Sequence, residues 1–240
     1  MIEWLRETGR SPTIELSGRI VPIDIRRHPR ATRLTLRLAP DGSAVRITLP
    51  RWCRTDEAVR FAAIRRKWLE TQLAKVPQAQ DPVARGTLRH RGAELVIDWR
   101  ADLPRKPAHI GNVLRIGGPN ETLSSRLQRW LEGEALALMR ADLAEFAPRA
   151  HRDVPDIRLS RAQRRWGSCS SSGVVRINWR LVQAPDFVRR SVVAHEVAHL
   201  VHFDHSPSFH ALLETIYGGS LEEADGWLRA RGRGLYADFG

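Results

Sequence analysis

The amino-acid sequence predicts an α+β protein with a β-rich N-terminal portion and a largely helical C-terminal portion. Alternating apolar residues between Thr13 and Leu49 are typical of strands with one buried face. Apolar residues at helical spacing recur from about residue 55 to Pro77 and again over long stretches after Pro119. Strands grouped ahead of helices are typical of the α+β class.

The N-terminal portion is expected to hold a small sheet and one helix. We expect residues 1–12 to form a loosely held arm and residues 13–80 to form a subdomain of antiparallel strands followed by a helix. A turn signal at residues 40–43 separates two of the strands. The helix carries basic residues, but its regular apolar stripe, which includes Ile64 and Trp68, favours packing against a core over contact with nucleic acid.

A polar linker at Gln78–Gly86 separates this subdomain from a second region at residues 86–240. Three short strand-like runs lie between Leu88 and Ile116. A long helix follows, opening near Pro119 and continuing to Pro148. The second portion therefore begins with strands and continues into a helix long enough to support a core.

The segment before a further helix, predicted from residue 186 onward, is expected to form a hairpin. Ile157–Leu159 and Trp166–Ser170 look like adjoining strands, and Val174–Asn178 looks like a further strand after a turn. The helix itself is predicted over residues 186–203, with Asp186 as a candidate cap.

This helix contains the pattern His-Glu-x-x-His at residues 195–199. His195 and His199 are four residues apart, so both point from one face of the helix, one turn apart, and two such imidazoles can bind one zinc ion. Glu196 lies beside the ion, where a carboxylate can accept a proton from metal-bound water. Because the surrounding residues are apolar, unpartnered polar side chains would be costly here, which favours a metal site over a chance match.

A catalytic zinc usually has three protein ligands and one open position. His205 is the favoured third ligand, because a turn after the helix can bring it back toward the ion. The rivals are His202, which lies too far along the axis from His195, His210 on the next helix, and a later glutamate, either Glu222 or Glu223. For the group that stabilises the developing oxyanion, proximity in the chain offers Tyr217, His202 and His210 without a choice among them.

The segments RWGSC (165–169), INWRLVQAP (177–185), HEVAHL (195–200) and HSPSF (205–209) resemble the YgjP-like metallopeptidase family, a zincin group related to the SprT-like proteases. The resemblance implies a zincin-like catalytic core, three metal ligands at His195, His199 and His205, and a catalytic carboxylate at Glu196. It also implies that an edge strand, formed by Val174, Val175, Arg176, Ile177 and Asn178, binds extended peptide substrate.

The amino-acid composition indicates which binding partners and which cellular compartment to expect. The formal net charge of +12 favours anionic partners such as nucleic acid, although the arginines are dispersed and a solvated basic surface fits equally well. Cys53 and Cys169 are far apart and suggest neither a disulfide nor a cysteine metal site. Without a signal peptide or a spanning segment in the sequence, we expect a cytoplasmic protein with no membrane partner.

The sequence thus predicts a zinc-dependent metallopeptidase whose Zn²⁺-activated water attacks a peptide bond, with Glu196 as general base. One alternative is metal-dependent hydrolysis of a nucleotide phosphoanhydride, against which stands the absence of a Gly-rich phosphate loop. Others are a protease recruited to DNA and a nucleic-acid adaptor with structural zinc; Glu196 argues against the adaptor, because a structural site has no use for a base.

Overall fold

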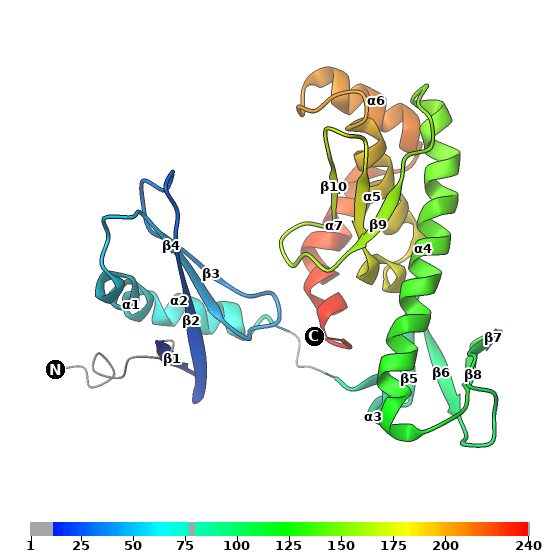
Figure 1. Ribbon diagram of the computed structural model, residues 1–240, viewed down its shortest axis with the longest axis horizontal. Helices are drawn as coiled ribbons and strands as arrows, with labels where there is room; N and C mark the ends of the chain where they lie inside the picture. The colour runs from blue at the N-terminus through cyan, green and yellow to red at the C-terminus, as the bar shows by residue number, and fades with distance from the viewer. Residues whose placement is uncertain (1–11, 77–79, 240) are drawn as a thin grey trace. The chain divides into compact units, whose positions relative to one another are not determined.

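A computed structural model describes residues 12–76 and 80–239 of the chain, which divides into two compact units, Met1–Gln78 and Ala79–Gly240 (Figure 1). The division lies inside the polar linker that the sequence predicts. Strands precede helices along the chain, which confirms the α+β class. Apart from residue 12, the predicted N-terminal arm lies outside the described residues.

The first unit contains a four-stranded sheet in the order β1-β2-β4-β3. Its strands are β1 (Thr13–Leu16), β2 (Arg19–Arg27), β3 (Thr35–Leu38) and β4 (Val45–Leu49). β4 forms a hairpin with β3 but also pairs with β2, and the β2–β4 pair is parallel. The sheet is therefore mixed rather than wholly antiparallel as predicted, because β4 inserts between two strands that precede it in sequence.

Two helices, α1 (Thr55–Ile64) and α2 (Arg66–Leu73), replace the single helix predicted in this unit. Arg65, at φ −92° and ψ 10°, interrupts the helical geometry between them. The apolar period is broken at this residue, and Ile64 and Trp68 are 80% and 44% exposed. The prediction that both belong to a core-facing stripe is therefore wrong, although Ala62 and Leu69 are buried.

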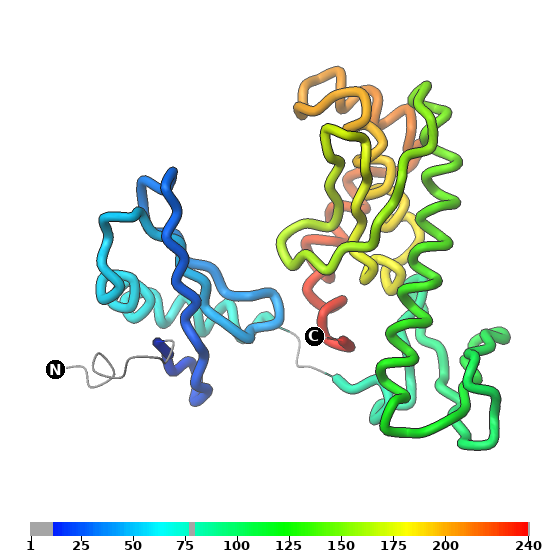
Figure 2. The backbone as a smooth tube through the Cα atoms, viewed as in Figure 1, coloured from blue at the N-terminus to red at the C-terminus, as the bar shows by residue number. Residues whose placement is uncertain are grey.

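The second unit begins with a short helix and a second four-stranded sheet in the order β5-β6-β8-β7. The long α4 and the three helices after it, α5, α6 and α7, make up most of the rest (Figures 1 and 2). The bounds are α3 (Pro82–Arg85), β5 (Thr87–His90), β6 (Ala93–Trp99), β7 (Ala108–Ile110), β8 (Val113–Ile116), α4 (Leu123–Arg149), α5 (Asp186–Ala198), α6 (Pro207–Tyr217) and α7 (Leu221–Arg231).

The core of the second unit lies where α4 packs along α5. Apolar residues of α4 at helical spacing are fully buried, among them Leu131, Met139 and Phe146. They share one cluster with Val193 and Val197 of α5. Burial of side chains of this size stabilises the fold by roughly 1.5–3 kcal/mol each. α5, the element that carries the His-Glu-x-x-His pattern, is thus fixed on a rigid support.

A three-stranded sheet adjoins α5, formed by β9 (Ile157–Ser160), β10 (Gly167–Cys169) and β11 (Val175–Asn178). Its order is β10-β11-β9, with β11 antiparallel to β10 and parallel to β9. The prediction that Val174–Asn178 is an edge strand is therefore wrong, because β9 occupies the side that a simple hairpin would leave free. For the same reason β9 and β10 do not adjoin, and each of them forms one edge of the sheet.

A buried ion pair joins α4 to α5. The carboxylate of Asp142 accepts a hydrogen bond from Nε of Arg189 at 2.7 Å, and both side chains are only 3% exposed. Arg189 also bonds the carboxylate of Asp186, which Arg91 contacts at 2.5 Å. Asp186 therefore pairs with two arginines instead of capping α5, for which no side-chain cap bond is present.

Replacement of Asp142 by alanine is expected to lower the free energy of unfolding by about 3–5 kcal/mol, because it leaves the Arg189 guanidinium buried without its main partner. Denaturant unfolding followed by circular dichroism measures this loss. Asp98→Ala serves as the control, since Asp98 pairs with the half-exposed Arg115 and such a pair is worth less than about 1 kcal/mol. Equal losses in the two variants would contradict the structural role of Asp142.

Across the part of the chain that the structure describes, none of the helices combines the length and apolar character needed to cross a membrane.

Candidate active site

The two motif histidines lie at the C-terminal end of α5. The helix ends at Ala198, five residues before the predicted end at residue 203, and His199 follows it in helical conformation. The His199 N–H still donates to the carbonyl of His195 at 3.2 Å, so the spacing of one turn between the two histidines is kept. The N–H groups of Leu200 and Val201 then donate to carbonyls only three residues earlier, those of Val197 and Ala198, and the chain leaves the α-helix.

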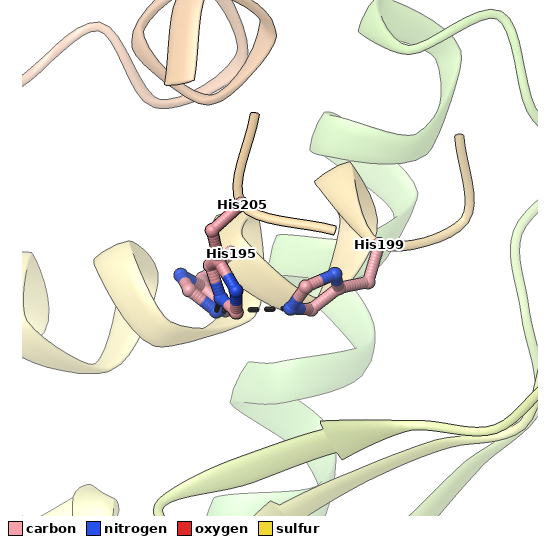
Figure 3. Close-up of side chains that lie close together, drawn as sticks. All are labelled: His195, His199 and His205. Atoms are coloured by element: carbon pink, nitrogen blue, oxygen red, sulfur yellow. Dashed lines mark hydrogen bonds between the residues drawn. The ribbon is translucent and has the colours of Figure 1, made fainter. Parts of the chain in front are cut away.

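The early end of α5 brings His205 back to the motif. The chain turns through residues 199–206 before α6 begins, and the Ser206 hydroxyl accepts the Phe209 N–H to cap that helix. Figure 3 shows the side chain of His205 meeting those of His195 and His199. The short connection between the two helices thus places all three histidines together.

Three imidazole nitrogens converge at this point. Nε2 of His195 lies 3.1 Å from Nε2 of His199 and 3.3 Å from Nε2 of His205. Nδ1 of His199 lies 2.9 Å from the carbonyl oxygen of His202, which can only accept, so Nδ1 carries a ring proton and Nε2 is the nitrogen that faces the other two rings. The aromatic ring of Phe209 lies within 5.0 Å of all three imidazole centroids and packs them together.

This arrangement fits a metal ion. Burial, followed by repulsion from His199 and His205, lowers the pKa of His195 to about 4, so its ring is neutral at pH 7 and can donate a lone pair. Nitrogens bound to one tetrahedral zinc at about 2.0–2.1 Å lie roughly 3.3–3.4 Å apart, close to the separations present here. A cation at this point can be bound by all three nitrogens at once.

Among the described residues, His195, His199 and His205 form the one group of potential metal ligands, with donor atoms within 4.8 Å of one another. His202, His210, Glu222 and Glu223, which the sequence offers as rivals for the third ligand, are not part of this group. His202 instead contributes its carbonyl oxygen to the orientation of His199.

Glu196 is held against the edge strand β10 with one oxygen free. Its side chain is buried, the Cys169 N–H donates to the carboxylate, and the buried Oε2 has no hydrogen-bond partner in the protein. Burial raises the pKa of Glu196 to about 7, against the opposing effects of Arg165 and the Cys169 N–H. A nearby cation lowers the pKa of a carboxylate, so a metal at the histidines favours the ionised form of Glu196.

Strand β10 fits closely around this carboxylate. A Cβ atom placed on Gly167 would lie 2.3 Å from Oε1 of Glu196, so only glycine leaves the side chain in its position. The sequence shows Gly167 within RWGSC but gives no sign of this contact, which depends on how β10 meets α5. Gly167 and the Cys169 N–H, which position Glu196, are therefore not among the site residues predicted from the sequence.

The outer backbone edge of β10 faces this site. The Trp166 carbonyl accepts the Asn178 N–H of β11, and Ser168 is opposite Arg176 in the same register. The Ser170 N–H donates to the carbonyl of Val174, just before β11. In an antiparallel pair the alternate residues, here Gly167 and Cys169, direct their N–H and C=O groups away from the partner strand. The Cys169 thiol is not a nucleophile here, because burial and then Glu196 raise its pKa.

The three candidates for oxyanion stabilisation differ in position. Tyr217 is buried and its hydroxyl donates to the carbonyl of Phe187 at 2.9 Å, so it is already engaged. His210 lines a cavity together with His195 and Glu196, as does Arg165, whereas His202 does not. Of the three, only His210 borders the same space as Glu196.

A family model described as "YgjP-like, metallopeptidase domain" matches residues 32–231 of the chain. The match includes β10, the three histidines and Glu196. A comparison with curated proteins and a comparison with solved structures give no match.

Proposed function

The chain belongs to the YgjP-like metallopeptidase family, and on this basis we propose that it is a zinc-dependent peptidase whose metal is held by His195, His199 and His205. The observation that carries the proposal is the convergence of three imidazole nitrogens beside a buried carboxylate with a free oxygen. When bound there, zinc would supply Lewis-acid chemistry, polarising a carbonyl and lowering the pKa of water to about 7.

Glu196 is proposed to act as the general base and then as the general acid. Its free Oε2 accepts the proton of the attacking water and returns it to the amine that leaves. The Cys169 N–H holds the carboxylate in place during the transfer. His210 and Arg165 border the same space, so either can donate to the oxygen on which charge develops.

An extended peptide is proposed to pair with the outer edge of β10. The outward N–H and C=O groups of Gly167 offer backbone hydrogen bonds to such a strand, next to Glu196. This assignment replaces Val174–Asn178, whose position in the middle of the sheet leaves its backbone paired on both sides.

Three points stay predictions from the sequence. They are zinc as the specific metal, the nucleotide and nucleic-acid alternatives, and the cytoplasmic location. A peptidase substrate follows from the family, whereas no described feature favours a phosphoanhydride or a DNA strand as ligand. The test of metal removal therefore includes a nucleotide and a DNA strand as competing substrates.

Removal of the metal is expected to abolish peptide hydrolysis. Dialysis against a chelator should lower the rate at least about 10²-fold, and one equivalent of Zn²⁺ should restore it, because the chain would lose its Lewis acid and its source of hydroxide together. Quenched fluorescent peptides measure the rate, with a nucleoside triphosphate and single-stranded DNA tested in parallel. Metal-dependent hydrolysis of the nucleotide without peptide cleavage would replace the peptidase proposal by the phosphoanhydride alternative.

A further inference from the structure

A cavity of about 540 Å³ opens beside the candidate active site, between α5, α6, α7 and β10. His195 and Glu196 form part of its wall, so a group in the cavity lies next to the reacting atoms. Its volume is in the range of pockets that bind small ligands or large side chains. Because of this position, the chain segment that enters the cavity is one directly beside the bond that is cleaved.

The cavity has an apolar part, which is formed by Trp166, Val192, Leu213, Leu221 and Leu228. Apart from Gly167, its other lining residues are polar or charged: Arg165, Ser191, His195, Glu196, His210, Glu222, Asp225 and Arg229. Of the apolar residues, Val192 and Leu213 are buried, and the other three are half-buried members of the main core. An apolar side chain that enters gains contact with this apolar part and leaves water, which favours it over a small or polar one.

Outside the candidate active site, the charged residues and the histidine of the cavity are exposed to solvent: Arg165, His210, Glu222, Asp225 and Arg229. The Ser191 hydroxyl donates to the carbonyl of Val188 at 2.9 Å. At the mouth, Asp225 and Arg229 pair at 3.1 Å and are both largely exposed. Their charges therefore offset each other in water, and a charged group carried past them into the cavity would lose hydration without a dedicated partner.

We propose that this cavity is the specificity pocket of the peptidase and that it accepts a large apolar side chain, such as leucine or phenylalanine, of the residue beside the scissile bond. The inference rests on the proposed function and adds the substrate class to it: peptides with a bulky apolar residue at the cleavage site. The charged residues at the mouth lie outside the apolar walls and meet the solvent.

The test uses metal-loaded protein and a series of quenched peptides of one sequence, in which the residues flanking the cleaved bond are changed singly to Leu, Phe, Ala, Asp or Lys. We expect kcat/KM for the Leu or Phe peptide to exceed that for the Ala peptide at least about tenfold on one side of the bond. Faster cleavage of the Ala, Asp or Lys peptide would overturn the proposal.

Variants that fill the cavity test its location. Leu221→Trp should bring the ratio of kcat/KM for the Leu and Ala peptides close to one, and Leu228→Trp serves if the first variant does not fold. Leu212→Trp is the matched control, since Leu212 is a half-buried leucine of α6 outside the cavity, and it should keep the wild-type ratio. A ratio that survives both filling variants in folded protein would overturn the proposal.

A binding measurement separates this inference from the proposed function. Metal-loaded Glu196→Gln protein is titrated into fluorescently labelled Leu and Ala peptides, and anisotropy reports their affinities without turnover. Tighter binding of the Leu peptide than of the Ala peptide supports the pocket, provided that the difference is lost in a Glu196→Gln, Leu221→Trp double variant. This outcome would support the pocket even if the wild type cleaves nothing and the peptidase proposal fails. Equal affinities for the two peptides would reject the pocket even if the wild type cleaves both.

Discussion

Glu196→Gln is expected to lower kcat for peptide hydrolysis about 10²–10⁴-fold while the protein still binds one metal ion per chain. Glutamine has the shape of glutamate and can occupy the same space against β10, but its amide cannot accept the proton of the attacking water. Because Glu196 is not one of the three grouped donors, the metal site should remain intact. Quenched-peptide kinetics and elemental mass spectrometry on the same preparation measure the two quantities.

The matched control is Glu214→Gln, which makes the same chemical change at an exposed residue of α6 and should leave both quantities at wild-type values. Retention of wild-type kcat in Glu196→Gln would remove Glu196 from the mechanism. Loss of the metal in that variant would instead mean that the carboxylate is needed to hold the ion.

Gly167→Ala is expected to reduce kcat by roughly 10²-fold although it adds one methyl group on a neighbouring strand. The new Cβ would lie 2.3 Å from Oε1 of Glu196, so the carboxylate must move away from its position beside the histidines. Displacement of a catalytic group by about 1 Å can cost a factor of this size. The same Cβ would also lie 2.7 Å from Cδ and Cγ of the buried Glu196, so the whole side chain must shift and the thermal midpoint should fall while the fold is kept.

Gly133→Ala provides the comparison, since a Cβ at this exposed position of α4 meets no atom within 4 Å. It should leave kcat unchanged and can stabilise the helix slightly. A Gly167→Ala protein with wild-type kcat would show that Glu196 has more freedom than the close contact with β10 implies. A protein that unfolds would show that the methyl group displaces the strand instead of the carboxylate.

The clustering of the three histidines could be predicted from local sequence because its geometry is local. Spacing of four residues fixes the relation of His195 to His199 on any helix, and His205 is only six residues further on, across a single turn. Turn chemistry at Ser206 and Pro207 correctly indicated that a new helix begins there. The structure adds that α5 ends early, at Ala198, which gives the turn enough residues to bring His205 back.

The substrate side of the site could not be predicted because it depends on strand order. Whether Val174–Asn178 is an edge strand depends on the partner taken by Ile157–Ser160, and pairing between segments distant in sequence leaves no local signal. The contact of Gly167 with Glu196 is likewise set by how a sheet packs on a helix. Sequence patterns give the period of each element but not its neighbours.

The first unit shows a similar limit. A regular apolar stripe predicted one helix with Ile64 and Trp68 facing a core, and the break at Arg65 changes which residues face inward. A helix period can be read from sequence only as long as the helix is continuous. A single residue outside helical geometry therefore leaves Ile64 and Trp68 exposed, although most of the stripe around them is buried or half-buried.

The central claim is that His195, His199 and His205 together hold one catalytic metal ion. The most direct test is elemental mass spectrometry of protein purified without chelator or affinity tag, for the wild type, His205→Ala and a Glu222→Ala, Glu223→Ala double variant. We expect one zinc per chain in the wild type and in the glutamate variant, and little or none in His205→Ala. Zinc retained in His205→Ala but lost in the glutamate variant, or no metal in the wild type after reconstitution, would contradict the three-histidine site.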